Sequence, residues 1–179
     1  MTRYAAFLRG IMPSNPNMRN DRLRAVVEGL GFDGVGSVLS SGNIVFGCAQ
    51  TDPAELEDKI QAALRAELGI GGGTIVRARD ELRALVDSDP FADLTHGRGS
   101  YLTATFLKQP MPGPLATAPP ELAAAVRVVR YDVPARAVLS VIDNTSAETS
   151  KYMGWVEQVY GKDITTRTWL TVHKVLAKL

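Results

Sequence analysis

The sequence has few of the residues from which disulfides, metal sites and membrane spans are built. It contains a single cysteine, Cys48, which excludes an internal disulfide. With only two histidines in the chain, we also expect no structural zinc site. No run approaches the ~18 consecutive apolar residues of a spanning helix, and residues 1–6 lack the apolar core of a signal peptide. We therefore expect a cytoplasmic protein without a membrane partner, bound metal or cofactor.

The sequence also has little net charge, +1 over 179 residues, which argues against strong nonspecific binding of nucleic acid. Basic residues nevertheless gather at both ends of the chain, and residues 1–24 hold five arginines against one aspartate. This distribution has two interpretations: the basic residues are solvated charges on ordinary helices, or they form part of an anion-binding site. The 45% apolar and 22% charged fractions are typical of a folded domain.

Hydrophobic periodicity predicts alternating strands and helices in the first half of the chain. Asp52 and Pro53 are a capping residue and a first-turn proline, so a helix is expected to begin there and to end at the glycines of 71–73. The predicted elements are strands at 4–8, 35–39, 44–46 and 74–76, a helix at 21–30, and the helix that begins at 53. This β-α-β-β-α-β order is the ferredoxin-like arrangement.

The second half predicts a similar order, β-α-β-β-α with an extra C-terminal helix. The predicted elements are strands at 102–107, 126–131 and 137–142, a helical turn at 121–125, and helices at about 149–160 and 167–178. We therefore expect an α+β fold in which two ferredoxin-like subdomains, 1–78 and 100–179, pack as one compact domain spanning residues 1–179.

Three strings are more specific than these periodicities. They are the run from Phe7 to Ile11 with the Asn-Pro-Asn loop after it, the hairpin from Ser40 to Phe46, and the segment from Ile164 to Trp169. Together they resemble a bacterial domain-of-unknown-function family numbered 1697. The resemblance implies an α+β fold of ferredoxin-like subdomains and no assigned activity. Many members of the family have Leu-Arg-Gly-Ile-Asn followed by a glycine pair, whereas this chain reads Ile11-Met12-Pro13-Ser14-Asn15-Pro16 after Gly10.

The same strings hold the candidate ligand-binding residues. Arg9 closes the first strand, and Thr165 is expected to open the last helix, whose N-terminal N–H groups attract anions. An arginine fork suits phosphate or carboxylate. The candidates are Arg9, Asn17, Ser41, Asn43, Thr165, Thr166 and Arg167. Each also has a structural interpretation: the threonines cap a helix, Asn43 supplies a turn conformation, and Arg9 pairs with an acidic neighbour such as Asp21.

The leading hypothesis is a binding module for an anionic ligand, either a nucleotide or another phosphorylated metabolite. Single-stranded nucleic acid is the weaker version, because the predicted strands offer few aromatics outside apolar surroundings. A small enzyme acting on a phosphate or acyl substrate is an alternative, although neither His96 nor His173 has a visible nucleophile partner. A structural or self-associating protein is a third possibility. The sequence leaves the catalytic residues and the oligomeric state open.

Overall fold

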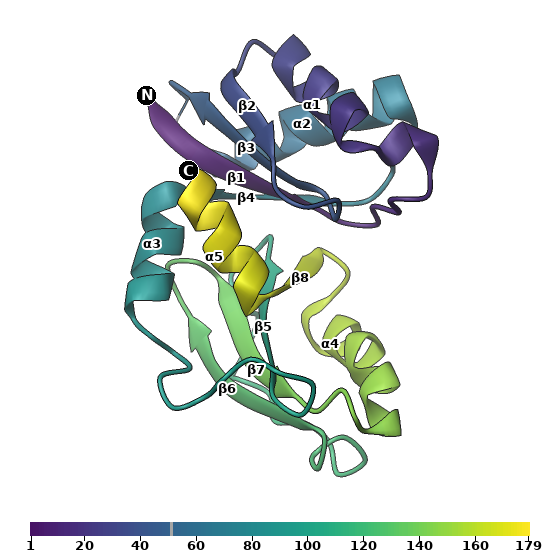
Figure 1. The fold of residues 1–179 in the computed structure, drawn as a ribbon, viewed down its shortest axis with the longest axis vertical. Coiled ribbons are helices and arrows are strands. Elements are labelled where there is room, and N and C mark those ends of the chain that lie inside the picture. The colour runs from purple at the N-terminus through teal and green to yellow at the C-terminus, as the bar shows by residue number, and fades with distance from the viewer. Residues whose placement is uncertain (51) are drawn as a thin grey trace. The chain divides into compact units, whose positions relative to one another are not determined.

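The computed structural model describes residues 1–50 and 52–179, which divide into two compact units (Figure 1). The first unit holds Met1–Arg83 and Lys174–Leu179, and the second holds Ala84–His173. Each unit contains a four-stranded antiparallel sheet with helices. The α+β class expected from the sequence is confirmed. None of the helices in the described part of the chain is long and apolar enough to cross a membrane.

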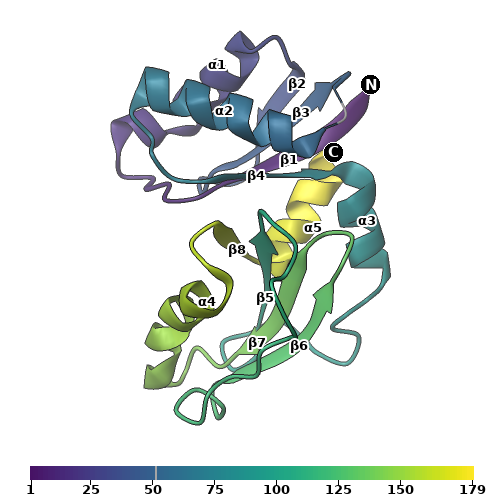
Figure 2. The same cartoon turned by 180° about the vertical axis from the view of Figure 1, so that it is seen from behind.

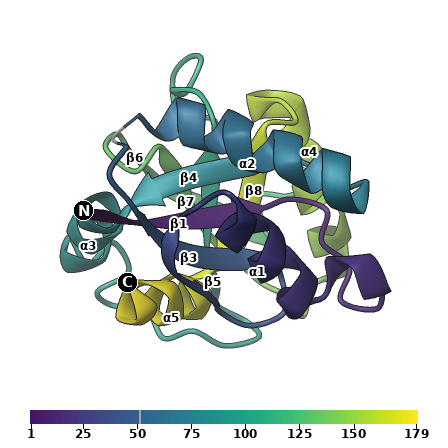
Figure 3. The same cartoon turned by 90° about the horizontal axis from the view of Figure 1, so that it is seen from above.

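The first unit has the predicted β-α-β-β-α-β order. Its elements are β1 (Thr2–Leu8), α1 (Asn20–Gly29), β2 (Asp33–Ser37), β3 (Asn43–Cys48), α2 (Pro53–Leu68) and β4 (Thr74–Ala78). The strands lie in the order β2-β3-β1-β4, and α1 and α2 lie together on one face of this first sheet (Figure 3). Alternate residues of β1, including Tyr4, Ala6 and Leu8, pack under these helices.

Local signals set the ends of α2. The side chain of Asp52 accepts a hydrogen bond from the backbone N–H of Ala54 at 2.9 Å, which confirms the predicted cap. The helix ends at Gly69, whose φ of 68° is the left-handed conformation that glycine adopts without a steric cost. The expectation that the glycines of 71–73 end the helix was therefore wrong by two residues.

A buried ion pair covers the β4 edge of the first sheet. Glu57, on α2, accepts a hydrogen bond from the backbone N–H of Val76 at 2.9 Å. Its carboxylate also lies 3.7 Å from Nη1 of Arg77, and the two side chains are 2% and 0% exposed. A charged pair that also binds the strand backbone leaves this edge closed to a further strand.

The second unit contains the second sheet. Its strands are β5 (Tyr101–Leu107), β6 (Val126–Asp132), β7 (Ala137–Ile142) and β8 (Ile164–Thr168), in the order β6-β7-β5-β8. The helix α4 (Tyr152–Tyr160) follows a short 3₁₀ helix (Ala147–Lys151) and lies beside the second sheet (Figure 2). It packs with Val126, Val138 and Ile142 in one apolar cluster. Two further helices, α3 (Arg79–Asp87) and α5 (Trp169–Lys178), each contribute residues to both units.

The structure confirms the helical turn and corrects one prediction in this half. Residues 120–125 form hydrogen-bonded turns, in which the N–H of Ala123 donates to the Pro119 carbonyl at 2.9 Å, the spacing of a helical turn. The segment from Ile164 to Thr168, predicted to lead into a helix at 167, is the strand β8 and pairs with β5. Its β-branched residues favour the extended conformation, and β5 offers a free edge for them. The last helix therefore begins at Trp169.

Thr168, the residue before α5, caps that helix. Its hydroxyl accepts a hydrogen bond from the backbone N–H of Thr171 at 3.2 Å, which satisfies one free donor of the first turn. Thr168→Ala is therefore expected to lower the free energy of unfolding by about 1 kcal/mol, measured by urea denaturation. An unchanged stability would show that the hydroxyl does not act as a cap.

Candidate functional site

The candidate residues fall into two groups, one in each unit. Arg9, Asn17, Ser41 and Asn43 belong to the first unit, and Thr165, Thr166 and Arg167 belong to the second. Arg9 directly follows β1, and Asn43 opens β3 opposite Phe7 of β1. The fold therefore brings Arg9 and Asn43 to the same end of the first sheet. We call this the loop end, formed by residues 9–19, 38–42 and 69–73.

Backbone hydrogen bonds tie the three loops of the loop end together around Arg9. The N–H of Leu8 donates to the Gly42 carbonyl at 2.8 Å, and the N–H of Arg9 donates to the Gly73 carbonyl at 2.8 Å. Arg9 thus leaves β1 between the hairpin loop on one side and the glycine loop on the other. Its side chain is half-buried.

Two glycines make this close approach possible, and no sequence pattern connected them with Arg9. A Cβ atom on Gly72 would lie 2.0 Å from the carbonyl oxygen of Arg9. A Cβ atom on Gly42, where φ is +77°, would lie 2.5 Å from Cγ1 of Ile11. Only glycine fits at either position without a shift of the neighbouring atoms.

The hairpin loop is held by asparagines. Asn43 is fully buried, and its Nδ2 donates to the Val38 carbonyl at 2.9 Å and to the Ser41 hydroxyl at 3.0 Å. Asn20 donates from Nδ2 to the Leu39 carbonyl at 2.7 Å, while Leu39 itself has a φ of 57°. A non-glycine residue in this conformation stores strain, which is common at binding sites. Asn43 therefore holds the conformation of the hairpin loop through hydrogen bonds from a buried position.

One buried acceptor at the loop end lacks a partner. The Oδ1 atom of Asn20 has no hydrogen-bond donor within residues 1–50 and 52–179. A buried polar atom of this kind costs about 1–3 kcal/mol unless a water or a ligand donates to it. Periodicity predicted a helix from residue 21, directly after Asn20, so the sequence did not mark Asn20 as a site residue.

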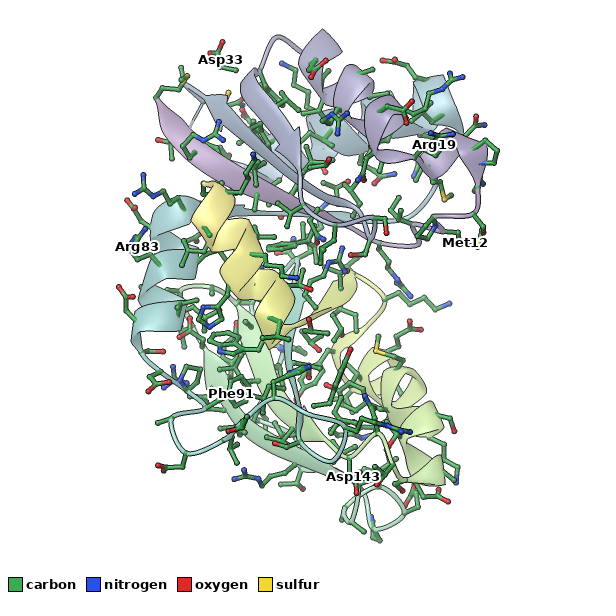
Figure 4. The ribbon with its side chains drawn as sticks, in the orientation of Figure 1. Met12, Arg19, Asp33, Arg83, Phe91 and Asp143 are labelled. Carbon is green, nitrogen blue, oxygen red and sulfur yellow. The ribbon has the colours of Figure 1, made fainter. Side chains whose placement is uncertain are left out.

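The rim of the loop end combines exposed polar and apolar side chains. Asn17 is exposed, and its backbone N–H donates to Oδ1 of Asn15 at 3.0 Å. Met12 and Leu39 are 56% and 47% exposed, although both are large apolar residues. Figure 4 shows Met12 and Arg19 along the outer rim of the loop that follows β1. The Nε atom of Arg19 lies 3.6 Å from Asp21, so this exposed aspartate, considered above as a partner for Arg9, pairs with Arg19.

The second group has a different environment from the one predicted. Thr165 and Arg167 are buried in β8, so neither they nor Thr166 lie at a helix N-terminus, and the anion argument built on that terminus was wrong. Nη1 of Arg167 donates to the Thr165 hydroxyl at 2.7 Å and to the Thr166 carbonyl at 3.0 Å. Burial lowers the pKa of Arg167 to about 10. The Thr166 hydroxyl shares a hydrogen bond of 2.8 Å with Thr105.

Two further side chains of the second unit, those of Trp169 and His96, make structural contacts. Trp169 is buried, and its ring lies 5.2 Å from that of Phe91. Nδ1 of His96 accepts a hydrogen bond from the backbone N–H of Leu102 at 3.2 Å, which gives this histidine a structural contact. Among residues 1–50 and 52–179, no three histidine, cysteine, aspartate or glutamate side chains could hold a metal ion together.

Comparison with known proteins gives a family and a fold. A family model described as "Protein of unknown function (DUF1697)" matches residues 1–132. The structure of conserved bacterial protein SP0830 from Streptococcus pneumoniae is similar, with a TM-score of 0.72 and 19% sequence identity. The similarity covers 99% of this chain and 97% of that one. At this identity the likeness shows the fold alone. No curated protein matches the chain.

Proposed function

The chain belongs to the DUF1697 family of proteins of unknown function, and we propose from its geometry that it is a binding module for a small organic anion. The ligand would bind at the loop end of the first sheet. The observation that carries the proposal is the position of Arg9, which leaves β1 between two loops that hydrogen bonds fix on either side of it. The proposal rests on the first unit, because hydrogen bonds within β8 and to Thr105 of β5 already involve Thr165, Thr166 and Arg167.

The charge of this region favours an anion. The three loops of the loop end contain two arginines, Arg9 and Arg19, and no acidic residue, which favours a positive potential there. A guanidinium group binds the oxygen atoms of a phosphate or carboxylate through two parallel hydrogen bonds. The close glycine contacts fix the loops before binding, so little conformational entropy would be lost when the ligand arrives.

The rim favours a ligand with an organic part over a bare inorganic ion. Met12 and Leu39 present apolar surface on two loops of the same loop end. A nucleotide or another phosphorylated metabolite supplies a phosphate, an apolar or aromatic surface and hydroxyl groups in one molecule. Single-stranded nucleic acid shares this chemistry and serves as a separate arm of the test.

The test is a thermal-shift screen of the full chain against nucleotides, phosphorylated sugars, inorganic phosphate and short oligonucleotides. A ligand at ~100 times its dissociation constant stabilises the folded state by about 2.7 kcal/mol. For a chain of this size that raises Tm by roughly 5–10 °C. Arg9→Met should abolish the shift.

Arg127→Met is the matched control, because Arg127 is an exposed arginine on β6 of the second unit. It should leave the shift intact. A ligand that shifts Arg9→Met as much as the unmodified chain contradicts the proposed position, and no shift with any anion contradicts the proposed function. Oligonucleotides that bind more tightly than mononucleotides, with a steep salt dependence, would favour the nucleic-acid version.

A further inference from the structure

The strand β6 is an open edge of the second sheet. It has seven residues, whereas the other edge strands, β2, β4 and β8, have five each. Its backbone pairs with β7 on one side. In the described part of the chain, no further backbone hydrogen bond reaches residues 127–132 from the other side. By contrast, Glu57 covers the β4 edge. A long open edge can pair with a strand from another molecule.

Shallow grooves flank β6. Val128 lines a groove of about 250 Å³ together with Ala118 and Ala123. The next residue, Val129, lines another of about 230 Å³ together with Phe91. Arg127 lines both grooves, so a strand added at this edge would lie beside both of them.

We propose that β6 pairs antiparallel with β6 of a second copy of this chain. The sequence of the strand complements itself in one register, in which Arg127 faces Asp132 of the other copy and Val128 faces its Tyr131. Arg127 and Asp132 lie on the same face, because their partners on β7, Val141 and Ala137, are four residues apart. The two-fold symmetry of such a pair makes each contact twice.

The same register accounts for an exposed apolar residue. Val133, the first residue of the turn after β6, is 70% exposed. In the proposed pair it lies opposite Val126, which lines the groove with Ala118 and Ala123. The register that is shifted by two residues places Arg127 opposite Arg130 instead, and like charges in facing positions are destabilising. The two arginines therefore select the register that pairs Arg127 with Asp132.

The pair is expected to be weak. A single pair of seven-residue strands buries less than the roughly 1,200–2,000 Å² of stable complexes. The irregularity between Val128 and Arg130 also increases the local twist of the edge. We therefore expect a dissociation constant in the micromolar range or above, and a dimer that forms as the protein is concentrated.

Sedimentation velocity of the full chain, from low micromolar to submillimolar concentration, should show a monomer–dimer equilibrium. Arg127→Asp places like charges opposite each other twice and should leave only the monomer, while its melting temperature shows that it still folds. Arg22→Asp, a change of an exposed arginine on α1, should dimerise as the unmodified chain does. A chain that is monomeric at every concentration overturns the proposal. The open edge of β6 would then be a site for an extended segment of a different molecule. An undiminished dimer in Arg127→Asp overturns it too.

Cross-linking tests the register. In a Cys48→Ser background, Arg127→Cys and Asp132→Cys should each form no disulfide-linked dimer alone, because neither position faces itself in the other copy. A mixture of the two variants should form one on oxidation. Equal cross-linking in the single variants overturns the register. If Asp132→Cys fails to fold, since Asp132 accepts a hydrogen bond from Ala135 N–H, the sedimentation of Arg127→Asp still decides the proposal.

Discussion

Glu57→Ala is expected to lower the free energy of unfolding by about 3–5 kcal/mol, the usual cost of removing one partner of a buried ion pair. The substitution leaves the guanidinium of Arg77, which is 0% exposed, without its carboxylate. It also removes the acceptor for the backbone N–H of Val76 at the β4 edge. Chemical denaturation monitored by circular dichroism measures the change.

Glu67→Ala is the control, because Glu67 is an exposed glutamate on the same helix, and we expect it to change stability by less than about 0.5 kcal/mol. The double variant Glu57→Leu/Arg77→Met should recover much of the loss, since an apolar pair has no charge to desolvate. A Glu57→Ala protein as stable as the Glu67→Ala protein would show that the ion pair contributes little.

Gly72→Ala is expected to destabilise the first unit by about 3 kcal/mol, at the upper end of the cost of forcing an atom into a packed site. The added Cβ would lie 2.0 Å from the carbonyl oxygen of Arg9, a backbone atom that cannot turn away as a flexible side chain does. The chain around Arg9 has to move, so the anion-dependent thermal shift should fall as well.

The neighbouring Gly71 provides a matched control, because a Cβ there would meet no atom within 4 Å. Gly71→Ala should retain the stability of the unmodified chain within about 0.5 kcal/mol. Comparing the two alanine variants by denaturation and by ligand-induced thermal shift separates the effect of the Arg9 contact from a general loss of loop flexibility. Equal behaviour of the two would contradict the tight packing at Arg9.

The sequence predicted the parts of the fold that local chemistry controls. The helix at 53–68 was marked by Asp52 and Pro53, whose capping geometry depends only on neighbouring residues. The hairpin of β2 and β3 was marked by the turn residues of its loop and by the β-prone runs on either side of that loop. The strand β8 was missed, because Ile164 to Thr168 becomes a strand by pairing with β5, a segment some sixty residues away in the chain.

The candidate site divides in the same way. The sequence alone identified Arg9, Asn17, Ser41 and Asn43 by their place at strand ends and turns, and it showed the excess of arginine around the first of them. The tertiary structure decided which loops close around Arg9. The contacts from Gly72 and Asn20, like the burial of Arg167, depend on atoms far apart in the sequence, and hydrophobic periodicity contains no information about such contacts.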